Sequence, residues 1–424
     1  MRRTAGFLFV LLVGLASVAH GAGAFHLRDG DRVLFYGDSI TERGLYTAIV
    51  ETYAVTRYPG LDLTFVNAGW AGDTVRGGTG GSLDTRLARD VLPHGPTVMT
   101  IMLGMNDRSG AEGMNDRQFF SGYENLISSM RARLPAVRIT AVIPSPYDDV
   151  TRPPAPYGSG NAVLARFGRW IESYATEAGL GLADMNAPLV QVLARANEVD
   201  PERARGIIPD RMHPGMAGAL IMAEQLLKAW NARPLVAAAT IDTSGRVPEA
   251  VSIGHSRVSE LSRKGDGISW TQLDDALPLP FAAWERTEHD GPSVSLVIRC
   301  SDVTAVLNEQ PLWVTGLKEL GYALRIDGVA VGVFTSAELA EGVNLAVLDT
   351  PMAMQAGRVH ELTLAHQAIQ RARWRQVQVR LATYDLPQKK AAIEALDALE
   401  MVLVQQQREA ARPMPRRFEL IPNP

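Results

Sequence analysis

The first half of the chain alternates short apolar runs with stretches of helical spacing, and this alternation constrains the fold more than any other feature. The apolar runs are Arg32–Tyr36, Leu61–Val66, Thr97–Leu103 and Val137–Ile143. The helical stretches are Tyr46–Tyr58, Gln118–Leu134, Ala162–Ala178 and Met216–Trp230. Runs rich in Val, Ile, Leu, Phe or Thr that close on a turn-forming residue are typical of strands buried on both faces. The pattern therefore predicts an α/β fold in which helices cover both faces of a parallel sheet.

Polar and glycine-rich clusters follow the apolar runs, at the point where each predicted strand ends. Three of these clusters are Gly37-Asp38-Ser39, Asn67-Ala68-Gly69 and Gly104-Met105-Asn106-Asp107. In folds of this kind, ligands bind at the carboxyl ends of the strands. We therefore expect the clusters to meet at one edge of the sheet and to carry the chemistry.

The pattern changes after about Arg233, where segments of alternating polarity begin. The segments Ser293–Ile298, Tyr322–Ile326 and Val329–Phe334 predict strands, and Asp327-Gly328 predicts a hairpin turn between the last two. Met352–Leu381 and Lys389–Ala411 are helical in spacing and predict a helical hairpin that packs onto one of the domains. The proline-rich end, residues 413–424, is expected to be extended.

These patterns divide the chain into four predicted parts. They are a signal peptide over residues 1–24, an α/β catalytic domain over 25–232, a β-sandwich-like module over 233–350, and a helical hairpin with an extended tail over 351–424. At about 150 residues per domain, a chain of 424 residues is expected to hold two or three domains.

Residues 1–24 have the layout of a secretory signal peptide. Arg2 and Arg3 precede an apolar stretch from about Gly6 to Ala19, and Ala22-Gly23-Ala24 matches an A-x-A cleavage site. The alternative is an uncleaved anchor, but the stretch is shorter than the about 20 apolar residues needed to span a bilayer. We predict cleavage, no stable membrane anchor, and export to the periplasm or the extracellular space.

Charge and cysteine content exclude several classes of function. Lys and Arg number 42 against 46 Asp and Glu, which leaves a net charge of −4, so general binding to nucleic acid is not expected. Cys300 is the only cysteine, which rules out an intrachain disulfide and zinc sites built from several cysteines.

Ser39 lies directly after a predicted strand and before a predicted helix. A serine on such a turn has an exposed hydroxyl, and the N–H groups of the helix favour negative charge beside it. A serine nucleophile needs a base, and a base histidine needs a carboxylate that fixes its tautomer. Asp210-Arg211-Met212-His213 offers both groups on one loop. The alternatives are a helix-capping serine, a helix-capping aspartate and a solvent-exposed histidine.

Two further segments, at 69–74 and 104–107, offer neutral hydrogen-bond donors. A glycine N–H and an asparagine side-chain amide suit the stabilisation of an oxyanion. The sequence GMND occurs twice, so Asn106 and Asn115 compete for this role. Only Asn106 follows a predicted strand, and we therefore choose Asn106.

Four blocks in order resemble the SGNH (GDSL-type) hydrolases. The blocks are Gly37-Asp38-Ser39, NAGWAGDT at 67–74, GMND at 104–107 and DRMH at 210–213, and the resemblance covers roughly residues 30–231. It implies a flavodoxin-like three-layer α/β/α fold and serine esterase chemistry without a metal or other cofactor. It also implies that Ser39 is the nucleophile, His213 the general base and Asp210 the residue that orients the imidazole. The N–H groups of Ser39 and Gly72 and the side chain of Asn106 would form the oxyanion hole.

The substrate is less constrained than the reaction. Trp70, beside Gly72, could bind substrate or could equally be a packing residue. Export and the β-rich module favour short-chain, acetyl esters of carbohydrate as substrates. The substrate would then be an ester of a small molecule or of a glycan. One alternative is a lysophospholipase or lipid acyl esterase, and another is a degenerate scaffold that carries a glycan- or partner-binding module. The sequence makes no prediction of the oligomeric state.

Overall fold

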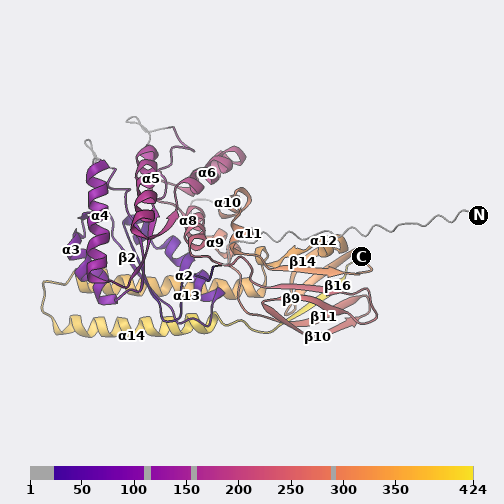
Figure 1. Ribbon diagram of the computed structural model, residues 1–424. Coiled ribbons are helices and arrows are strands. Elements are labelled where there is room, and N and C mark those ends of the chain that lie inside the picture. Colours follow the sequence, from indigo (N-terminus) through magenta and orange to yellow (C-terminus); the bar gives the residue numbers. More distant parts are fainter. Residues whose placement is uncertain (1–22, 109–115, 154–159, 288–292, 424) are drawn as a thin grey trace, which may run out of the picture.

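The computed structural model of the chain describes residues 23–108, 116–153, 160–287 and 293–423 (Figure 1). Apart from Gly23 and Ala24, the predicted signal peptide lies outside these ranges, and so does Asn115. Within them, no helix combines the length and the apolar composition needed to cross a bilayer.

A five-stranded parallel sheet forms the centre of the first domain, as the alternating pattern predicts. Its strands, in the spatial order β2-β1-β5-β6-β7, are β2 (Thr64–Gly69), β1 (Arg32–Gly37), β5 (Val98–Met102), β6 (Arg138–Ile143) and β7 (Gly181–Asp184). Val33, Leu34, Phe35 and Tyr36 of β1 are at most 1% exposed, because both faces of the sheet are covered. β1 therefore has β2 on one side and β5 on the other, which brings the ends of these three strands together.

Helices pack on the sheet in two layers, which confirms the predicted three-layer α/β/α architecture. The helices of this domain are α1 (Ser39–Glu42), α2 (Leu45–Arg57), α3 (Leu83–Arg86), α4 (Asp116–Arg133), α5 (Gly160–Ala178), α6 (Ala187–Val199), α7 (Pro201–Ile207) and α8 (Met216–Ala229). Helix α2 packs against α8, and α4 packs against α5. In the second of these pairs the rings of Phe119 and Phe167 stack with their centroids 3.9 Å apart. Between β2 and β5 the chain also forms the short strands β3 (Gly77–Gly78) and β4 (Gly81–Ser82) and two helical turns, η1 (Leu87–Val91) and η2 (Leu92–His94).

The second half forms the predicted β-rich module, which is made of two sheets. The first sheet has the order β10-β11-β16-β13-β14, from β10 (Ser256–Lys264), β11 (Gly267–Asp274), β16 (Arg416–Pro422), β13 (Gly321–Ile326) and β14 (Val329–Thr335). The second has the order β15-β12-β8-β9, from β15 (Val343–Asn344), β12 (Pro311–Thr315), β8 (Ala238–Asp242) and β9 (Glu249–Gly254). The hairpin predicted at Asp327-Gly328 joins β13 to β14, and both residues have positive φ, 51° and 79°. Such angles are those of the tight turn that an Asp-Gly pair favours.

One predicted strand of this region is wrong. Ser293–Ile298 was expected to be a strand, but the chain forms helix α10 (Val294–Cys300). Val294, Val297 and Cys300 are all buried, and their spacing of three residues fits one face of a helix packed against α6 and α8. The same six letters also alternate, so a short apolar segment of this kind supports either structure. The other helices of the region are α9 (Phe281–Thr287), α11 (Val303–Leu307), α12 (Ser336–Glu341) and the turn η3 (Leu345–Val347).

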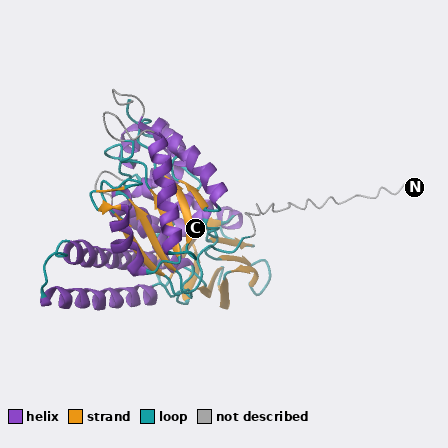
Figure 2. Cartoon of the chain, turned by 60° about the vertical axis from the view of Figure 1, so that its left-hand side comes forward, coloured by secondary structure: helices purple, strands orange, loops and turns teal. Residues whose placement is uncertain are grey.

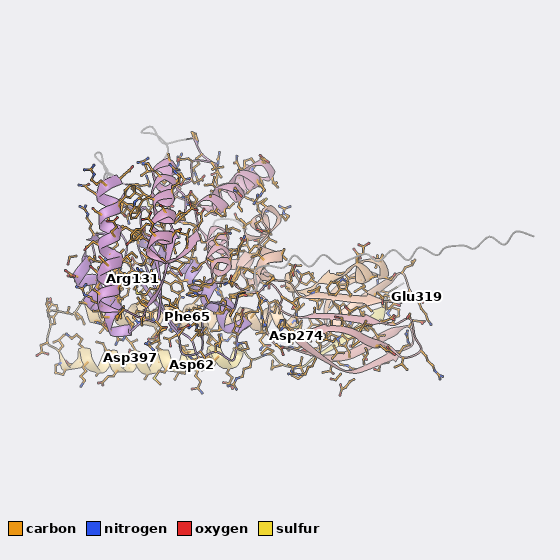
Figure 3. The ribbon with its side chains drawn as sticks, in the orientation of Figure 1. Asp62, Phe65, Arg131, Asp274, Glu319 and Asp397 are labelled. Carbon is orange, nitrogen blue, oxygen red and sulfur yellow. The ribbon has the colours of Figure 1, made fainter. Side chains whose placement is uncertain are left out.

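The helical tail lies along the α/β domain, as Figures 1 and 2 show for its two long helices. It consists of α13 (Pro351–Arg371), a π-helical continuation η4 (Ala372–Val379) and α14 (Pro387–Ala410). The Gln370 side chain donates to the Phe65 carbonyl (3.1 Å) and accepts from the Asn67 N–H (3.0 Å), so it satisfies the free edge of β2. Arg408 pairs with Asp62 just before β2, and Figure 3 labels Asp62 and Phe65 beside the tail. Covering an edge strand in this way removes a site for unwanted strand pairing.

A buried polar cluster anchors the tail independently of the sheet edge. His366 on α13 lies 3.2 Å from a carboxylate oxygen of Glu51 on α2 and 3.1 Å from one of Glu400 on α14. Burial opposes the charge on His366, but the two glutamates outweigh burial and raise its pKa to about 10. Gln407 joins the cluster through a 2.8 Å bond to Glu51. A charged histidine between two carboxylates therefore binds three helices together.

Candidate active site

Ser39 is the first residue of a one-turn helix that follows β1 directly. Asp38 caps this helix, since its side chain accepts the N–H of Ile40 at 3.0 Å. Asp38 is 1% exposed, and burial raises the pKa of its carboxyl to about 7. Ser39 itself is only partly buried, so its hydroxyl stands at the surface of the strand ends. The predicted position on a strand-to-helix turn is confirmed.

A chain of hydrogen bonds joins Ser39 to His213, 174 positions away in the sequence, and through it to Asp210. The Oγ of Ser39 lies 2.8 Å from Nε2 of His213, and Nδ1 of His213 lies 2.7 Å from Oδ2 of Asp210. The side chains of His213 and Asp210 are 22% and 54% exposed. A hydroxyl, an imidazole and a carboxylate in this order can transfer a proton from the serine to the histidine while the carboxylate stabilises the imidazolium.

The loop 210–213 is tightly folded around the carboxylate of Asp210. Its Oδ1 accepts the N–H groups of Met212 (3.0 Å) and His213 (2.7 Å), and Arg211 turns the chain with a φ of 71°. Partial burial raises the pKa of Asp210, but the hydrogen bonds from His213 and Met212 outweigh burial and lower it below its usual value. The carboxylate that faces the imidazole is therefore ionised at neutral pH.

A partly buried ion pair between Arg152 and Asp148, which our sequence analysis did not single out, supports this loop. Arg152 donates from Nη1 to Asp148 (2.7 Å) and to the Ile208 carbonyl (3.1 Å), and from Nη2 to the Pro209 carbonyl (2.7 Å). The Arg211 carbonyl accepts the N–H of Asp148 at 2.8 Å. The Asp148 side chain is fully buried, and that of Arg152 is 21% exposed. No local pattern at 148–152 indicates this role, because the contacts are with residues more than fifty positions away.

The two predicted oxyanion donors come from the ends of the strands that flank β1. Gly72 follows β2 and has a φ of 75°, a conformation that favours glycine. Asn106 follows β5, and its side-chain amide donates to the Asp73 carbonyl at 2.9 Å. An asparagine amide has two N–H donors. One N–H of Asn106 therefore fixes the side chain through the Asp73 carbonyl.

Trp70 is placed as a packing residue. Its side chain is only 9% exposed, and its Nε1 donates to the hydroxyl of Thr79 at 3.1 Å. The guanidinium of Arg375 lies 3.4 Å from the centre of its ring, and Trp374 meets it edge-on. Of the two roles considered for Trp70, these contacts favour packing over direct binding of substrate.

Residues that could hold a metal do not gather at this site. In the ranges that the structure describes, no group of three or more His, Cys, Asp or Glu side chains has the arrangement of a metal site. The Asp38 carboxylate caps α1, and Oδ1 of Asp107 accepts the N–H of Val75 at 3.1 Å.

Comparison with known proteins identifies a family for the α/β domain. The model of the GDSL-like lipase/acylhydrolase family matches residues 35–221, which contain Ser39, Gly72, Asn106, Asp210 and His213. The chain is 25% identical over 224 residues to an acetylxylan esterase of Geobacillus stearothermophilus, a match that covers 47% of this chain and 93% of the relative.

One solved structure matches nearly the whole chain. It is that of a gut microbial diltiazem-metabolizing enzyme, with a TM-score of 0.80 and 26% identity over 95% of this chain and all of that one. The β-rich module and the helical tail therefore recur together with the α/β domain in another protein. The α/β domain of this chain belongs to the GDSL-like lipase/acylhydrolase family of SGNH hydrolases, and the protein is a carboxylic ester hydrolase.

Proposed function

We propose that the protein is an exported serine esterase that works through an acyl-serine intermediate formed on Ser39. The observation that carries this proposal is the unbroken chain of hydrogen bonds Ser39–His213–Asp210, with contacts of 2.8 and 2.7 Å. Ser39 is the nucleophile, His213 the general base and Asp210 the residue that orients the imidazole. The export part of the proposal rests on the sequence of residues 1–24.

The reaction has two halves that use the same residues. Oγ of Ser39 attacks the ester carbonyl as Nε2 of His213 takes its proton, and the resulting oxyanion accepts hydrogen bonds from the N–H groups of Ser39 and Gly72 and from Asn106. His213 then protonates the leaving alcohol, which departs and leaves Ser39 acylated. Water repeats the sequence, with His213 as base and then as acid, and releases the carboxylic acid and free Ser39.

For the substrate we propose short-chain, acetyl esters of carbohydrate. The acetylxylan esterase of Geobacillus stearothermophilus supports this choice, since 93% of that protein matches this chain at 25% identity. The relative that matches nearly the whole chain metabolises diltiazem, a small molecule, which supports a site open to small esters as well as to glycan fragments.

Replacing Asn106 by alanine is expected to lower kcat by about 10²–10³-fold with little change in KM, the usual effect of removing one oxyanion donor. The bond to the Asp73 carbonyl is also lost, so thermal unfolding of the variant should be measured beside its kinetics on nitrophenyl acetate. Asn125→Ala on α4, an exposed asparagine, is the control. A loss below about threefold would remove Asn106 from the oxyanion hole.

A series of nitrophenyl esters from acetyl to palmitoyl tests the acyl group. We expect the highest kcat/KM on acetate and a fall of about tenfold or more by butyrate, because a small acyl pocket discriminates strongly against added methylenes. Release of acetate from acetylated xylo-oligosaccharides should then be measured with the wild type and with Ser39→Ala. A maximum at long acyl chains would instead support the lipid esterase.

A further inference from the structure

Glu42 connects the nucleophile to the loop that carries Gly72. It is the last residue of α1, one turn after Ser39, and its side chain is only 11% exposed. Its Oε2 accepts the N–H of Ala71, the residue that precedes Gly72. The nucleophile turn and the oxyanion loop, residues 70–73, are therefore tied together by one carboxylate.

The charge of Glu42 is matched by the C-terminal tail, about 330 residues away in the sequence. Arg371, at the end of α13, donates to Oε1 of Glu42 at 2.8 Å, and Nη1 of Arg375 lies 3.6 Å from the same oxygen. Arg375 also stacks on the ring of Trp70, 3.4 Å from its centre. Arg371 and Arg375 are four residues apart, a spacing that places side chains on the same face of a helix, and both approach the same carboxylate.

A second connection runs from the tail to Asn106. Trp374 donates from Nε1 to Asp90 at 2.7 Å, and Asp90 pairs with Arg86. Arg86 binds the Asp73 carboxylate at 2.9 Å, and both side chains are fully buried. The carbonyl of Asp73 is the acceptor that fixes the amide of Asn106, at 2.9 Å. Arg375 and Trp374, which are adjacent in η4, are therefore connected by contacts to both proposed oxyanion donors, Gly72 and Asn106.

We propose that the helical tail is part of the catalytic apparatus, in which Arg371, Trp374 and Arg375 are positioning residues for the oxyanion loop 70–73. The proposal rests on the proposed function, because it needs Gly72 and Asn106 to be the oxyanion donors. The physical reason is geometric: the loop presents a left-handed glycine, and the tail-linked contacts of Glu42 with Ala71 and of Arg86 with Asp73 hold the residues on either side of it. A displacement of about 1 Å is enough to cost up to 10²-fold in rate.

The tail does not depend on these contacts for its own attachment. The buried cluster of Glu51, His366, Glu400 and Gln407 and the Gln370 contacts with β2 hold the tail without using Arg371, Trp374 or Arg375. Removal of Arg375 is therefore expected to release the loop without undocking the tail.

The test compares Arg375→Ala and Glu42→Ala with Arg373→Ala, a matched control on the same segment. Arg373 pairs with Asp397 of α14 and with Gln378 of η4, on the tail itself. For Arg375→Ala and Glu42→Ala we expect kcat on nitrophenyl acetate to fall about 10- to 100-fold, with KM within about threefold of wild type and the same melting temperature. Arg373→Ala should keep the wild-type kcat.

Two further measurements separate positioning from general support. A trifluoromethyl ketone forms an adduct with Ser39 that carries an oxyanion, so its inhibition constant should rise in parallel with the loss of kcat. The double variant Glu42→Ala/Arg375→Ala should lose no more than the worse single variant, because both residues act on the same loop. Glu42→Gln, which can still accept the Ala71 N–H, should recover most of the activity lost in Glu42→Ala.

The outcomes distinguish this proposal from the one on which it rests. If the wild type hydrolyses no ester, the serine mechanism fails and the role of the tail falls with it. If the wild type is active and Arg375→Ala and Glu42→Ala keep full kcat, only the role of the tail is overturned. Equal losses in Arg373→Ala, or losses that follow a lower melting temperature, would also overturn it, since the tail would then act through stability alone.

Discussion

Replacing Ser39 by alanine is expected to lower kcat by about 10⁵–10⁶-fold, the cost of removing a serine nucleophile elsewhere. The change deletes the Oγ that lies 2.8 Å from Nε2 of His213 and leaves the cap of α1, which is made by Asp38, in place. The variant should therefore keep the wild-type melting temperature. The measurement is kcat on nitrophenyl acetate, together with the mass of any acyl adduct on the protein.

The control for Ser39→Ala is Ser128→Ala. Ser128 is exposed on α4, and its hydroxyl donates only to the Asn125 carbonyl, at 3.1 Å. The Ser128→Ala variant should retain full activity. In a separate experiment, rapid mixing of the wild type with ester should show an acyl adduct on Ser39. Residual activity of Ser39→Ala within about tenfold of wild type would contradict a nucleophile at this position.

Replacing Asp210 by asparagine is expected to lower kcat by about 10⁴-fold while the protein stays folded. The asparagine oxygen can still accept the N–H groups of Met212 and His213, which hold the loop. Its amide nitrogen then faces Nδ1 of His213, where the wild type has an acceptor 2.7 Å away. Nδ1 must accept, the proton moves to Nε2, and the imidazole cannot take the proton of Ser39.

Asp184→Asn is the matched control for this change. The Asp184 carboxylate also accepts two backbone N–H groups, those of Asn186 (2.7 Å) and Ala187 (3.2 Å), but its bonds are to the backbone at the end of β7 rather than to a histidine. Both variants should be compared by kcat and by thermal unfolding. If Asp210→Asn hydrolyses ester at close to the wild-type rate, Asp210 serves only as a cap of its loop.

The strands of the α/β domain were predicted from the sequence where the apolar runs were long. The strands of the central sheet from β1 to β6 lie on or beside the predicted runs, because burial on both faces requires continuous apolar sequence. The strand β7 has only four residues, GLAD, and was not predicted, since so short a run does not differ from a loop. The strand predicted where α10 forms was wrong for a related reason, because six residues fit both the two-residue period of a strand and the 3.6-residue period of a helix.

In the β-rich module, the local sequence did not predict the order of the strands in the sheet. The end of the chain was predicted to be extended, and it is, but β16 lies in the middle of a sheet between β11 and β13. Its partners are separated from it by about ninety residues or more, including the whole helical tail. Strand order of this kind depends on long-range pairing, and the sequence of a single strand does not contain it.

The positions proposed for the chemistry follow from the sequence alone. Ser39 and Asn106 were predicted because parallel strands end at one edge of a sheet, and Asp210 and His213 because a serine nucleophile needs a base and a carboxylate that orients it. The support of these groups depends on how the folded chain packs. An arginine on a helix has the same local pattern whether its side chain is solvated or, like that of Arg375, stacks on Trp70 and lies beside Glu42. The same is true of Trp70 itself and of Arg152, because their partners lie far away in the sequence and are brought to them by packing of the finished fold.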